Sequence, residues 1–295
     1  MLTSVAVDVD ITQLVDSNVG VHAMLPKAIF LAGHPAPRPT ALRAVFQSRS
    51  PQWDYRKRVD PDTIGARDRE GSVALIDTVR EREGELRREL VRFGRWLHKL
   101  GFMPGTSGNL SVRLGDDRLL ATPTGASKYL LQSRDMVVID LDGRQISGSR
   151  KVTSEIGMHL AIYRQRLDVQ AVIHSHPVVA TAFACAGRAL DEPLCSEAVM
   201  ALGAVPLASY ATTGTDEVAA SLMNLIPRHE AILMANHGAV TYGTSLLDAF
   251  LKMETVEHYA KICLVAHQLG TPRPLKDLEV EQLVRAKSKY LQNAM

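Results

Sequence analysis

Three histidines in this chain have the spacing of a metal site. His174 and His176 are two positions apart at the end of an apolar run, and a second apolar run leads to His237. Residues i and i+2 of a strand point to the same face, so both imidazoles of the pair can reach one ion. Catalytic zinc sites usually have three protein ligands and one open position, whereas structural zinc sites have four. The pattern therefore predicts one Zn²⁺, or another divalent cation, per chain and an enzyme.

The remaining histidines lack comparable placement. They lie in expected helices or in the proline-rich N-terminal stretch, so we expect them to be structural or surface residues. They are His22, His34, His98, His159, His229, His258 and His267.

Glu155 is a candidate general base. It precedes His174 by nineteen positions and stands at the start of an expected helix, where the positive end of the helix dipole favours an ionised carboxylate. Taken alone, a glutamate at this place would be read as a surface residue at a helix start. Beside a metal site it becomes a candidate for moving a proton.

Three short polar segments indicate a phosphate pocket. They span residues 106–111, 122–125 and 153–154, where expected strands or helices turn. Glycine lets the backbone approach a ligand, hydroxyl and amide groups donate hydrogen bonds, and a helix N-terminus attracts an anion. Each segment alone is equally a turn or a helix cap. Their occurrence together with a metal site favours phosphate binding.

The elements that must position these residues predict an α/β fold. Strands are expected at 109–114, 118–122 and 136–140 with no helix between them, which requires antiparallel pairing. Helices are expected at 72–100, 155–166, 177–186, 216–225 and 245–269 and in the tail from 273, and further strands at 169–174, 231–236 and 239–242. We therefore expect a mixed, mainly antiparallel central sheet sandwiched by helices.

Residues 1–70 differ from the remainder. They contain six of the fourteen prolines and show no sustained helical or strand period. We expect residues 1–70 to be a poorly ordered or accessory N-terminal extension and residues 71–295 to form the catalytic domain.

Composition excludes several classes of partner. The net charge of +2 gives no basic surface for nucleic acid or an anionic membrane. No apolar stretch is long enough for a membrane helix, and the acidic N-terminus does not resemble a signal peptide. The three widely spaced cysteines fit a reduced compartment. The expected location is cytoplasmic.

Five motifs in a fixed order resemble those of a known family. They are Ser-Gly-Asn-Leu-Ser, Thr-Pro-Thr-Gly, Thr-Ser-Glu, His-Ser-His-Pro and Asn-His-Gly. From residue 85 or so to about 270 the chain resembles the class II aldolases, which include fuculose phosphate aldolase, ribulose phosphate 4-epimerase, methylthioribulose phosphate dehydratase and the non-enzymatic adducin head domain. The N-terminal stretch lies outside this resemblance.

The resemblance implies a role for each matching position. His174, His176 and His237 match the zinc ligands, and Glu155 matches the carboxylate that moves the proton in the aldolases. The positions that match phosphate contacts are Thr106, Asn109, Thr124, Gly125, Thr153 and Ser154. The family's fold is a mixed α/β sandwich around an antiparallel sheet. Its enzymes are commonly fourfold-symmetric, so a homotetramer with active sites at subunit contacts is expected.

One position departs from the aldolase pattern. The tyrosine that donates a proton in fuculose phosphate aldolase is absent from the stretch 193–197, and Glu197 stands nearby instead. In the dehydratases a glutamate in about the place of Glu197 is the acid–base group. Those enzymes lack a carboxylate at the position of Glu155, where epimerases typically have aspartate. Glu155 and Glu197 are the expected catalytic residues. Tyr210 or Tyr290 of an adjacent subunit is the alternative to Glu197.

The activity implied is zinc-dependent cleavage of a ketose 1-phosphate to dihydroxyacetone phosphate and an aldehyde. A methylthioribulose-1-phosphate dehydratase is the alternative, favoured by Glu197 and disfavoured by Glu155. A sugar-phosphate 4-epimerase fits less well because Glu155 replaces aspartate. An adducin-like module without activity fits less well because the histidine set is intact. The expected partner is a small phosphorylated sugar.

Overall fold

The central feature of the protein is an eight-stranded sheet with the order β4-β3-β2-β1-β5-β8-β7-β6. The computed structural model describes residues 68–293, and the side chains of residues 80–287. All neighbouring strands pair antiparallel except β6 and β7, which are parallel. The strands are β1 (Asn109–Arg113), β2 (Arg118–Ala121), β3 (Val137–Asp140), β4 (Gln145–Ser147), β5 (Ala171–Ser175), β6 (Leu207–Ala208), β7 (Ala231–Met234) and β8 (Gly238–Gly243).

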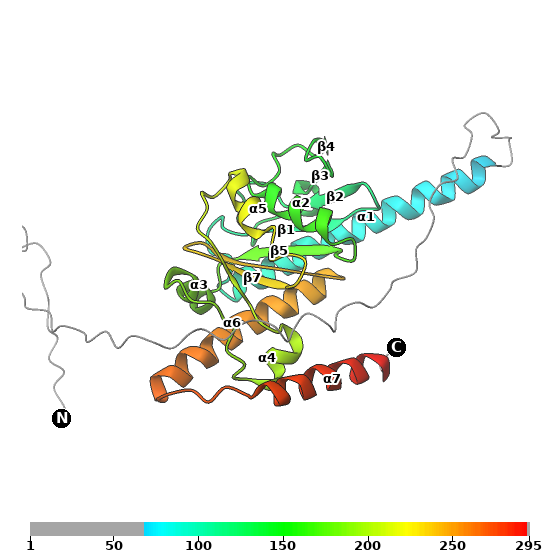
Figure 1. Cartoon of the computed structure of the whole chain (residues 1–295). Helices are drawn as coiled ribbons and strands as arrows, with labels where there is room; N and C mark the ends of the chain where they lie inside the picture. The colour runs from blue at the N-terminus through cyan, green and yellow to red at the C-terminus, as the bar shows by residue number, and fades with distance from the viewer. Residues whose placement is uncertain (1–67, 294–295) are drawn as a thin grey trace, which may run out of the picture. The chain divides into compact units, whose positions relative to one another are not determined.

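Helices cover both faces of the sheet (Figure 1). They are α1 (Asp68–Lys99), α2 (Ile156–Gln165), α3 (Val178–Cys185), α4 (Ser196–Ala201), α5 (Asp216–Leu222), α6 (Leu246–Leu269) and α7 (Asp277–Asn293), with a short 3-10 helix at Ser133–Asp135. This arrangement confirms the expected mixed, mainly antiparallel sheet sandwiched by helices.

Two hydrophobic clusters fill the space between the layers. Alternate residues of a strand point to opposite faces, so Ile173 of β5 belongs to the cluster that contains residues of α1, α3, α4 and α6, while Val172 belongs to the cluster that contains residues of α2 and α5. In α1, Leu90, Phe93 and Leu97 are buried at the helical spacing that the sequence displays. The sheet is therefore buried on both faces, and the site residues are held between packed layers.

Besides the 3-10 helix at Ser133–Asp135, three short elements are absent from the expectations drawn from the sequence. β4, α4 and β6 are two to six residues long, and none of them contains enough residues to show a period of 2 or 3.6. β6 forms because Leu207 and Ala208 pair with Leu233 and Met234 of β7, which is a contact between segments distant in the chain.

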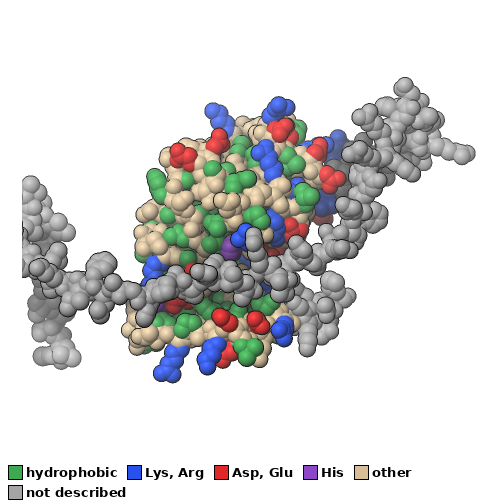
Figure 2. Space-filling view, viewed as in Figure 1, with side chains coloured by type: hydrophobic (Ala, Val, Ile, Leu, Met, Phe, Trp, Pro, Cys, Tyr) green, Lys and Arg blue, Asp and Glu red, His purple; other side chains and the backbone are tan. Residues whose placement is uncertain are grey.

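None of the described helices is long and apolar enough to cross a bilayer. Figure 2 shows positive and negative side chains interspersed over the face in view, in agreement with the small net charge.

The extension assigned to residues 1–70 lies outside the described residues, except for 68–70, which begin α1. We predict that a chain starting at Gly71 folds and keeps its activity, because no residue of the leader belongs to a motif and its composition shows no periodicity. The thermal transition and the specific activity of the shortened protein, compared with the full chain, check this. Loss of soluble, active protein would show that the leader supports folding or assembly.

Candidate metal centre and active site

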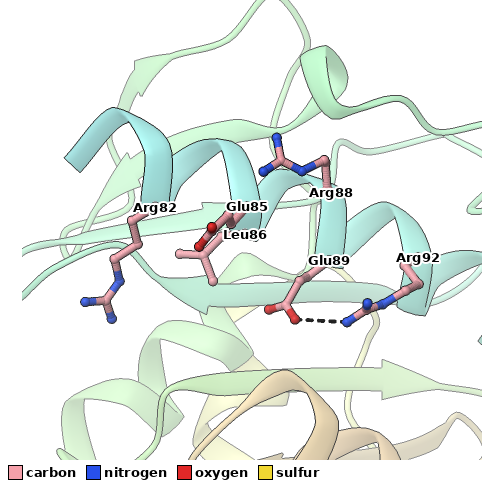
Figure 3. Close-up of a pocket in the computed structure, with 6 residues that line it drawn as sticks. All are labelled: Arg82, Glu85, Leu86, Arg88, Glu89 and Arg92. Carbon is pink, nitrogen blue, oxygen red and sulfur yellow. Dashed lines mark hydrogen bonds and ion pairs between the residues drawn. The ribbon is translucent and has the colours of Figure 1, made fainter. Parts of the chain in front are cut away.

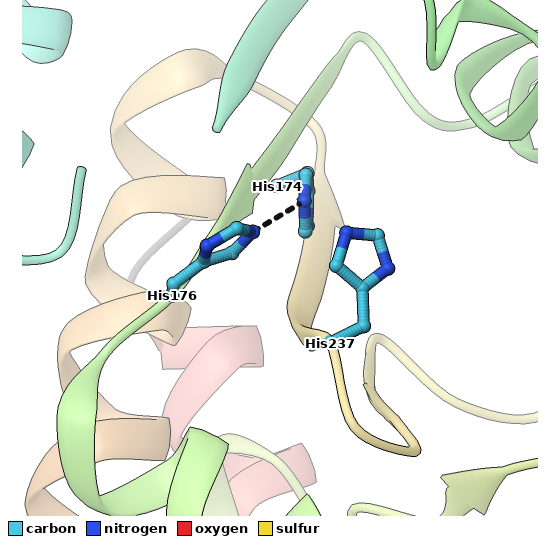
Figure 4. Close-up of side chains that lie close together, drawn as sticks. All are labelled: His174, His176 and His237. Carbon is cyan, nitrogen blue, oxygen red and sulfur yellow. Dashed lines mark hydrogen bonds between the residues drawn. The ribbon is translucent and has the colours of Figure 1, made fainter. Parts of the chain in front are cut away.

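The three predicted histidine ligands come together at one end of the sheet (Figure 4). One ligand atom from each of His174, His176 and His237 lies within 4.8 Å of the others. The ring centroids are 4.6 to 5.3 Å apart. His174 is fully buried, and His176 and His237 are partly exposed, so the cluster is open on one side. This is the arrangement expected for a metal site with a free position for substrate.

The local chain conformation explains this geometry and corrects one expectation. His174 belongs to β5, but His176 follows the end of that strand, and His237 lies in the tight turn between β7 and β8 rather than in a strand. Asn236 adopts a left-handed conformation with φ of 55° in this turn. A Cβ at Gly238 would lie 2.6 Å from the ring of His176, so only glycine allows this approach.

The donor set fits a divalent transition metal. Nδ1 of His174 donates to the carbonyl oxygen of Ala239 (2.9 Å), which leaves the lone pair of Nε2 directed into the cluster. Nε2 of His174 and Nε2 of His176 are 3.0 Å apart, close to the about 3.3 Å that two nitrogen ligands of a tetrahedral Zn²⁺ would have. Burial lowers the pKa of His174 to about 3, against the charge of Glu155, and also lowers the pKa of His176. Neutral imidazole is the form that binds a metal.

Glu155 lies directly beside this cluster. It is the residue preceding α2, and its Oε1 is 3.0 Å from Nε2 of His237 while its Oε2 is 3.4 Å from Nε2 of His174. Oε2 also accepts a hydrogen bond from Nδ2 of Asn109 (2.6 Å). Burial alone would raise the pKa of the Glu155 carboxyl, but the hydrogen bond with His237 and the neighbouring histidines hold it below its usual range. The group is an ionised carboxylate placed to exchange a proton with a substrate bound at the histidine cluster.

Two of the predicted phosphate segments pair with each other. The backbone N–H of Thr124 donates to the carbonyl of Lys151 (3.0 Å), and that of Thr153 donates to the carbonyl of Thr122 (3.2 Å). Segments 122–125 and 153–154 therefore lie side by side. Thr124, Gly125 and Ser154 are exposed and Thr153 is buried. The exposed groups leave backbone and hydroxyl donors accessible to an anion.

A lysine that belongs to none of the sequence motifs joins the first segment to the residue that follows the second. Nζ of Lys128 donates to the carbonyl oxygens of Thr106 (2.9 Å) and Ala126 (2.8 Å), and the side chain is 1% exposed. Burial lowers the pKa of Lys128 to about 8, an effect that the charge of Glu155 opposes. Lys128 holds the two loops together and adds positive charge near the site. In the sequence it is the one charged residue between Arg118 and Arg134.

Asn109 and Gly108 connect the first segment to the metal centre. Asn109 pairs with His174 across β1 and β5 and is 3% exposed, so its amide is directed at Glu155 rather than at solvent. Gly108 has φ of +70°, and a Cβ there would lie 2.7 Å from the carbonyl oxygen of His174. The glycine of this motif is therefore needed for the loop to pass close to the ligand strand.

Glu197 is placed differently from the other predicted residues. It lies in the first turn of α4, is exposed, and among the described residues its carboxylate contacts Cys195, whose thiol donates to it at 3.2 Å. The structure of the single chain does not bring it to the histidine cluster. Tyr210 is 67% exposed, and the side chain of Tyr290 lies outside those described.

A hollow along α1 is unrelated to these residues. Figure 3 shows that it is lined by one face of the helix, where Glu89 and Arg92 form an exposed ion pair at 3.0 Å. None of the predicted site residues lines it. Exposed pairs of this kind contribute little to stability.

Known proteins share the fold and the motifs of this chain. The sequence model for the Class II Aldolase and Adducin N-terminal domain matches residues 88–264, a range that contains all five motifs. The 3-oxo-tetronate 4-phosphate decarboxylase of Escherichia coli (strain K12) is 36% identical over 211 residues, which are 70% of this chain and 97% of that protein. The 5-deoxy-D-ribulose 1-phosphate aldolase of Bacillus thuringiensis serovar kurstaki is 34% identical over 68% of this chain and 93% of its own length.

A solved structure agrees with these relatives. An L-fuculose 1-phosphate aldolase superimposes with a TM-score of 0.65 and 35% identity, covering 68% of this chain and 95% of the other. The family model spans more than half of the chain, and the three-histidine cluster with its adjoining carboxylate lies inside the matched range. The protein therefore belongs to the class II aldolase family of metal-dependent enzymes.

Proposed function

We propose that the protein is a zinc-dependent carbon–carbon lyase that cleaves a ketose 1-phosphate and releases dihydroxyacetone phosphate. The observation that carries the proposal is the position of the Glu155 carboxylate, 3.0 Å from His237 and 3.4 Å from His174. Breaking a bond next to a ketone leaves an enediolate, which needs both charge stabilisation and a proton donor close to the same carbon.

Each part of the site has a role in this reaction. A divalent cation held by His174, His176 and His237 would supply the Lewis acid that stabilises the negative charge of the enediolate. Glu155 returns the proton to the enediolate carbon, giving dihydroxyacetone phosphate. The paired loops 122–125 and 153–154, together with Thr106, hold the phosphate end, so that the reacting carbon stays beside Glu155. Asn109 also matches a phosphate-contacting position of the family, but its buried amide is engaged with Glu155 and His159 instead.

The comparisons favour a second candidate reaction, in which CO₂ leaves in place of an aldehyde. Decarboxylases of a 3-oxo acid phosphate are as similar to this chain as the aldolases are. Loss of CO₂ from the carbon next to a ketone also leaves an enediolate that must be protonated, so the same cation site and Glu155 would serve both reactions. The two differ at the other end of the broken bond. An aldol cleavage must also remove a proton from a hydroxyl, whereas a decarboxylation does not.

Glu197 is the candidate for that second proton transfer. It is exposed on α4, and the contact that the structure gives its carboxylate is with Cys195 and not with the histidine cluster, so we propose that it reaches a site across a contact between subunits. We propose a homotetramer with active sites at subunit contacts, and the exposed apolar side chains of Trp96, Leu247 and Leu251 on α1 and α6 support an assembly of this kind. Light scattering of the purified protein measures the number of subunits. A molar mass of one chain would contradict the proposed tetramer.

A panel of substrates tests the proposed reaction. Zinc-loaded protein should convert fuculose-1-phosphate, 5-deoxyribulose-1-phosphate or methylthioribulose-1-phosphate to dihydroxyacetone phosphate and an aldehyde, followed by a coupled assay for the former and by aldehyde trapping for the latter. Glu197→Gln should slow this cleavage, because it removes the acceptor of the hydroxyl proton. With 3-oxo-tetronate 4-phosphate, release of CO₂ should not respond to Glu197→Gln.

Each other result has its own meaning. If the protein releases dihydroxyacetone phosphate and CO₂ from 3-oxo-tetronate 4-phosphate, and no aldehyde from any ketose phosphate, then it is a decarboxylase and not an aldolase. A diketone phosphate from methylthioribulose-1-phosphate, without dihydroxyacetone phosphate, would establish the dehydratase alternative. Undiminished aldehyde release by Glu197→Gln would place the second proton carrier elsewhere, with Tyr210 the first residue to replace.

A further inference from the structure

A row of polar side chains is buried between β1 and α2. Alternate residues of β1 point to opposite faces, and Asn109, Ser111 and Arg113 all face α2. Their exposed fractions are 3%, 0% and 8%. On the helix side, His159 and Tyr163 follow Glu155 at intervals of four, which places them on one face of α2. His159 and Tyr163 are both fully buried.

These side chains form a continuous series of hydrogen bonds that ends at Glu155. The Tyr163 hydroxyl is 2.9 Å from Oγ of Ser111, and that oxygen is 2.7 Å from Nδ1 of His159. Nε2 of His159 is 2.6 Å from Oδ1 of Asn109, whose Nδ2 is 2.6 Å from Oε2 of Glu155. We call these five residues the β1–α2 polar series.

Hydrogen-bond chemistry gives the polar series one direction. An ionised carboxylate can only accept, so Asn109 donates through Nδ2 and its oxygen must accept from Nε2–H of His159. A neutral imidazole has one N–H, so Nδ1 of His159 must accept from the Ser111 hydroxyl. Ser111 has then used its only proton and must accept from the hydroxyl of Tyr163. Every proton in the series is thereby assigned.

We propose that His159 is a positioning residue that acts as the neutral Nε2–H tautomer and locks the Asn109 amide in the orientation that donates to Glu155. A reversed Asn109 amide would present an oxygen to the carboxylate, and the two acceptors would repel each other. The orientation matters for the reaction because Asn109 holds Oε2 while Oε1 stays beside His237. His159 thus fixes the geometry of the proton carrier without contacting substrate.

The surroundings of His159 keep the ring neutral. Burial lowers its pKa to about 4, and the negative charge of Glu155 opposes this shift without cancelling it. The other titratable group against the ring is Tyr163, on the same face of α2, and burial raises the pKa of that phenol above its usual range. The facing residues of β1 next to the ring, Asn109 and Ser111, carry no charge.

Nitrogen NMR of protein with ¹⁵N-labelled histidine tests the tautomer directly. We expect the His159 ring, identified by its absence from the spectrum of His159→Gln, to carry its proton on Nε2 in the folded protein at neutral pH, with or without metal. Ser111→Ala removes the donor to Nδ1 and leaves the Asn109 acceptor in place, so the same ring should keep its proton on Nε2 while its Nδ1 resonance shifts. A proton on Nδ1, or a doubly protonated ring at neutral pH, in the parent protein would overturn the proposal.

Kinetics test the consequence, which rests on the proposed role of Glu155. His159→Leu should lower kcat by about 10- to 100-fold, the usual effect of removing a hydrogen-bond partner behind a site group. His159→Gln can place an amide N–H near the former Nε2, so it should recover part of kcat. Zinc content and KM should change little in either variant, because neither metal ligands nor phosphate contacts are touched.

Matched variants separate positioning from general destabilisation. Arg113 shares the same buried face and donates to the backbone carbonyls of Tyr163 and Val169. It also lies over the Tyr163 ring, at the end of the series far from Glu155, but it takes no part in the side-chain hydrogen bonds of the series. Arg113→Met should lower the melting temperature without lowering kcat, whereas Ser111→Ala should lower kcat, and it serves in place of His159→Leu if that variant does not fold. Parent-like kcat in both Ser111→Ala and His159→Leu would refute a positioning role. If the parent releases no dihydroxyacetone phosphate, the proposed function fails and the NMR result still decides the tautomer.

Discussion

Replacing His174 with alanine should remove both the bound metal and the activity of the protein. His174 is the proposed ligand with the most restricted geometry, because its ring is fully buried and its Nδ1 is hydrogen-bonded to the Ala239 carbonyl. With only His176 and His237 left, the cluster lacks the third ligand that a catalytic zinc site needs. Metal analysis of the purified parent should find about one divalent ion per chain. The variant should contain almost none, and its turnover should fall to background.

A histidine outside the cluster provides the matched control. His258 is exposed on α6, and His258→Ala should leave both metal content and turnover at the level of the parent. Adding Zn²⁺ after chelation should restore the parent and not the His174 variant. Full activity in thoroughly chelated, metal-free protein would refute the metal centre altogether.

Glu155→Gln should lower turnover by roughly two to four orders of magnitude, the usual contribution of a general acid or base. Glutamine has nearly the same size and can still accept a hydrogen bond from Asn109, so the loop and the helix start should be preserved. It cannot carry a proton between substrate and solvent. Because the three histidines remain, metal content should be nearly unchanged, and single-turnover rates should fall together with kcat.

A surface glutamate shows how much of this effect belongs to the site. Glu81 is exposed on α1, so Glu81→Gln removes an equal charge from the protein and should leave turnover unaltered. If Glu155→Gln retains the turnover of the parent, the proton is carried by another group and the assigned role is wrong. Loss of metal from Glu155→Gln would instead make this carboxylate a ligand.

The histidine cluster and the general fold were predictable because they depend on local sequence. The apolar runs before His174 and His237 identify strands, and a strand end fixes where a side chain stands. The uninterrupted succession of short strands requires antiparallel pairing, which the sheet confirms. Glu155 was predictable as a candidate for the same reason, since its place at a helix start is a local property.

The burial of His159 and Lys128 was not predictable in this way. The strand Asn-Leu-Ser-Val-Arg alternates polar and apolar residues, a pattern that normally indicates one face in solvent. Here α2 covers that face, so Ser111 and its neighbours must bond to helix residues instead of water. The interval of four that relates Glu155, His159 and Tyr163 is the sequence signal that could have identified the partner face.

The sequence by itself determined which donor atoms the protein can offer to a metal, because histidine types and strand periods are written along the chain. Only the tertiary structure decided how those donors are used. It placed the Glu155 carboxylate between His237 and His174, and it left Glu197 on the surface of α4. The physical reason is that a buried polar group must find its hydrogen-bond partner across the packing of separate elements, and that packing brings together residues far apart in the sequence.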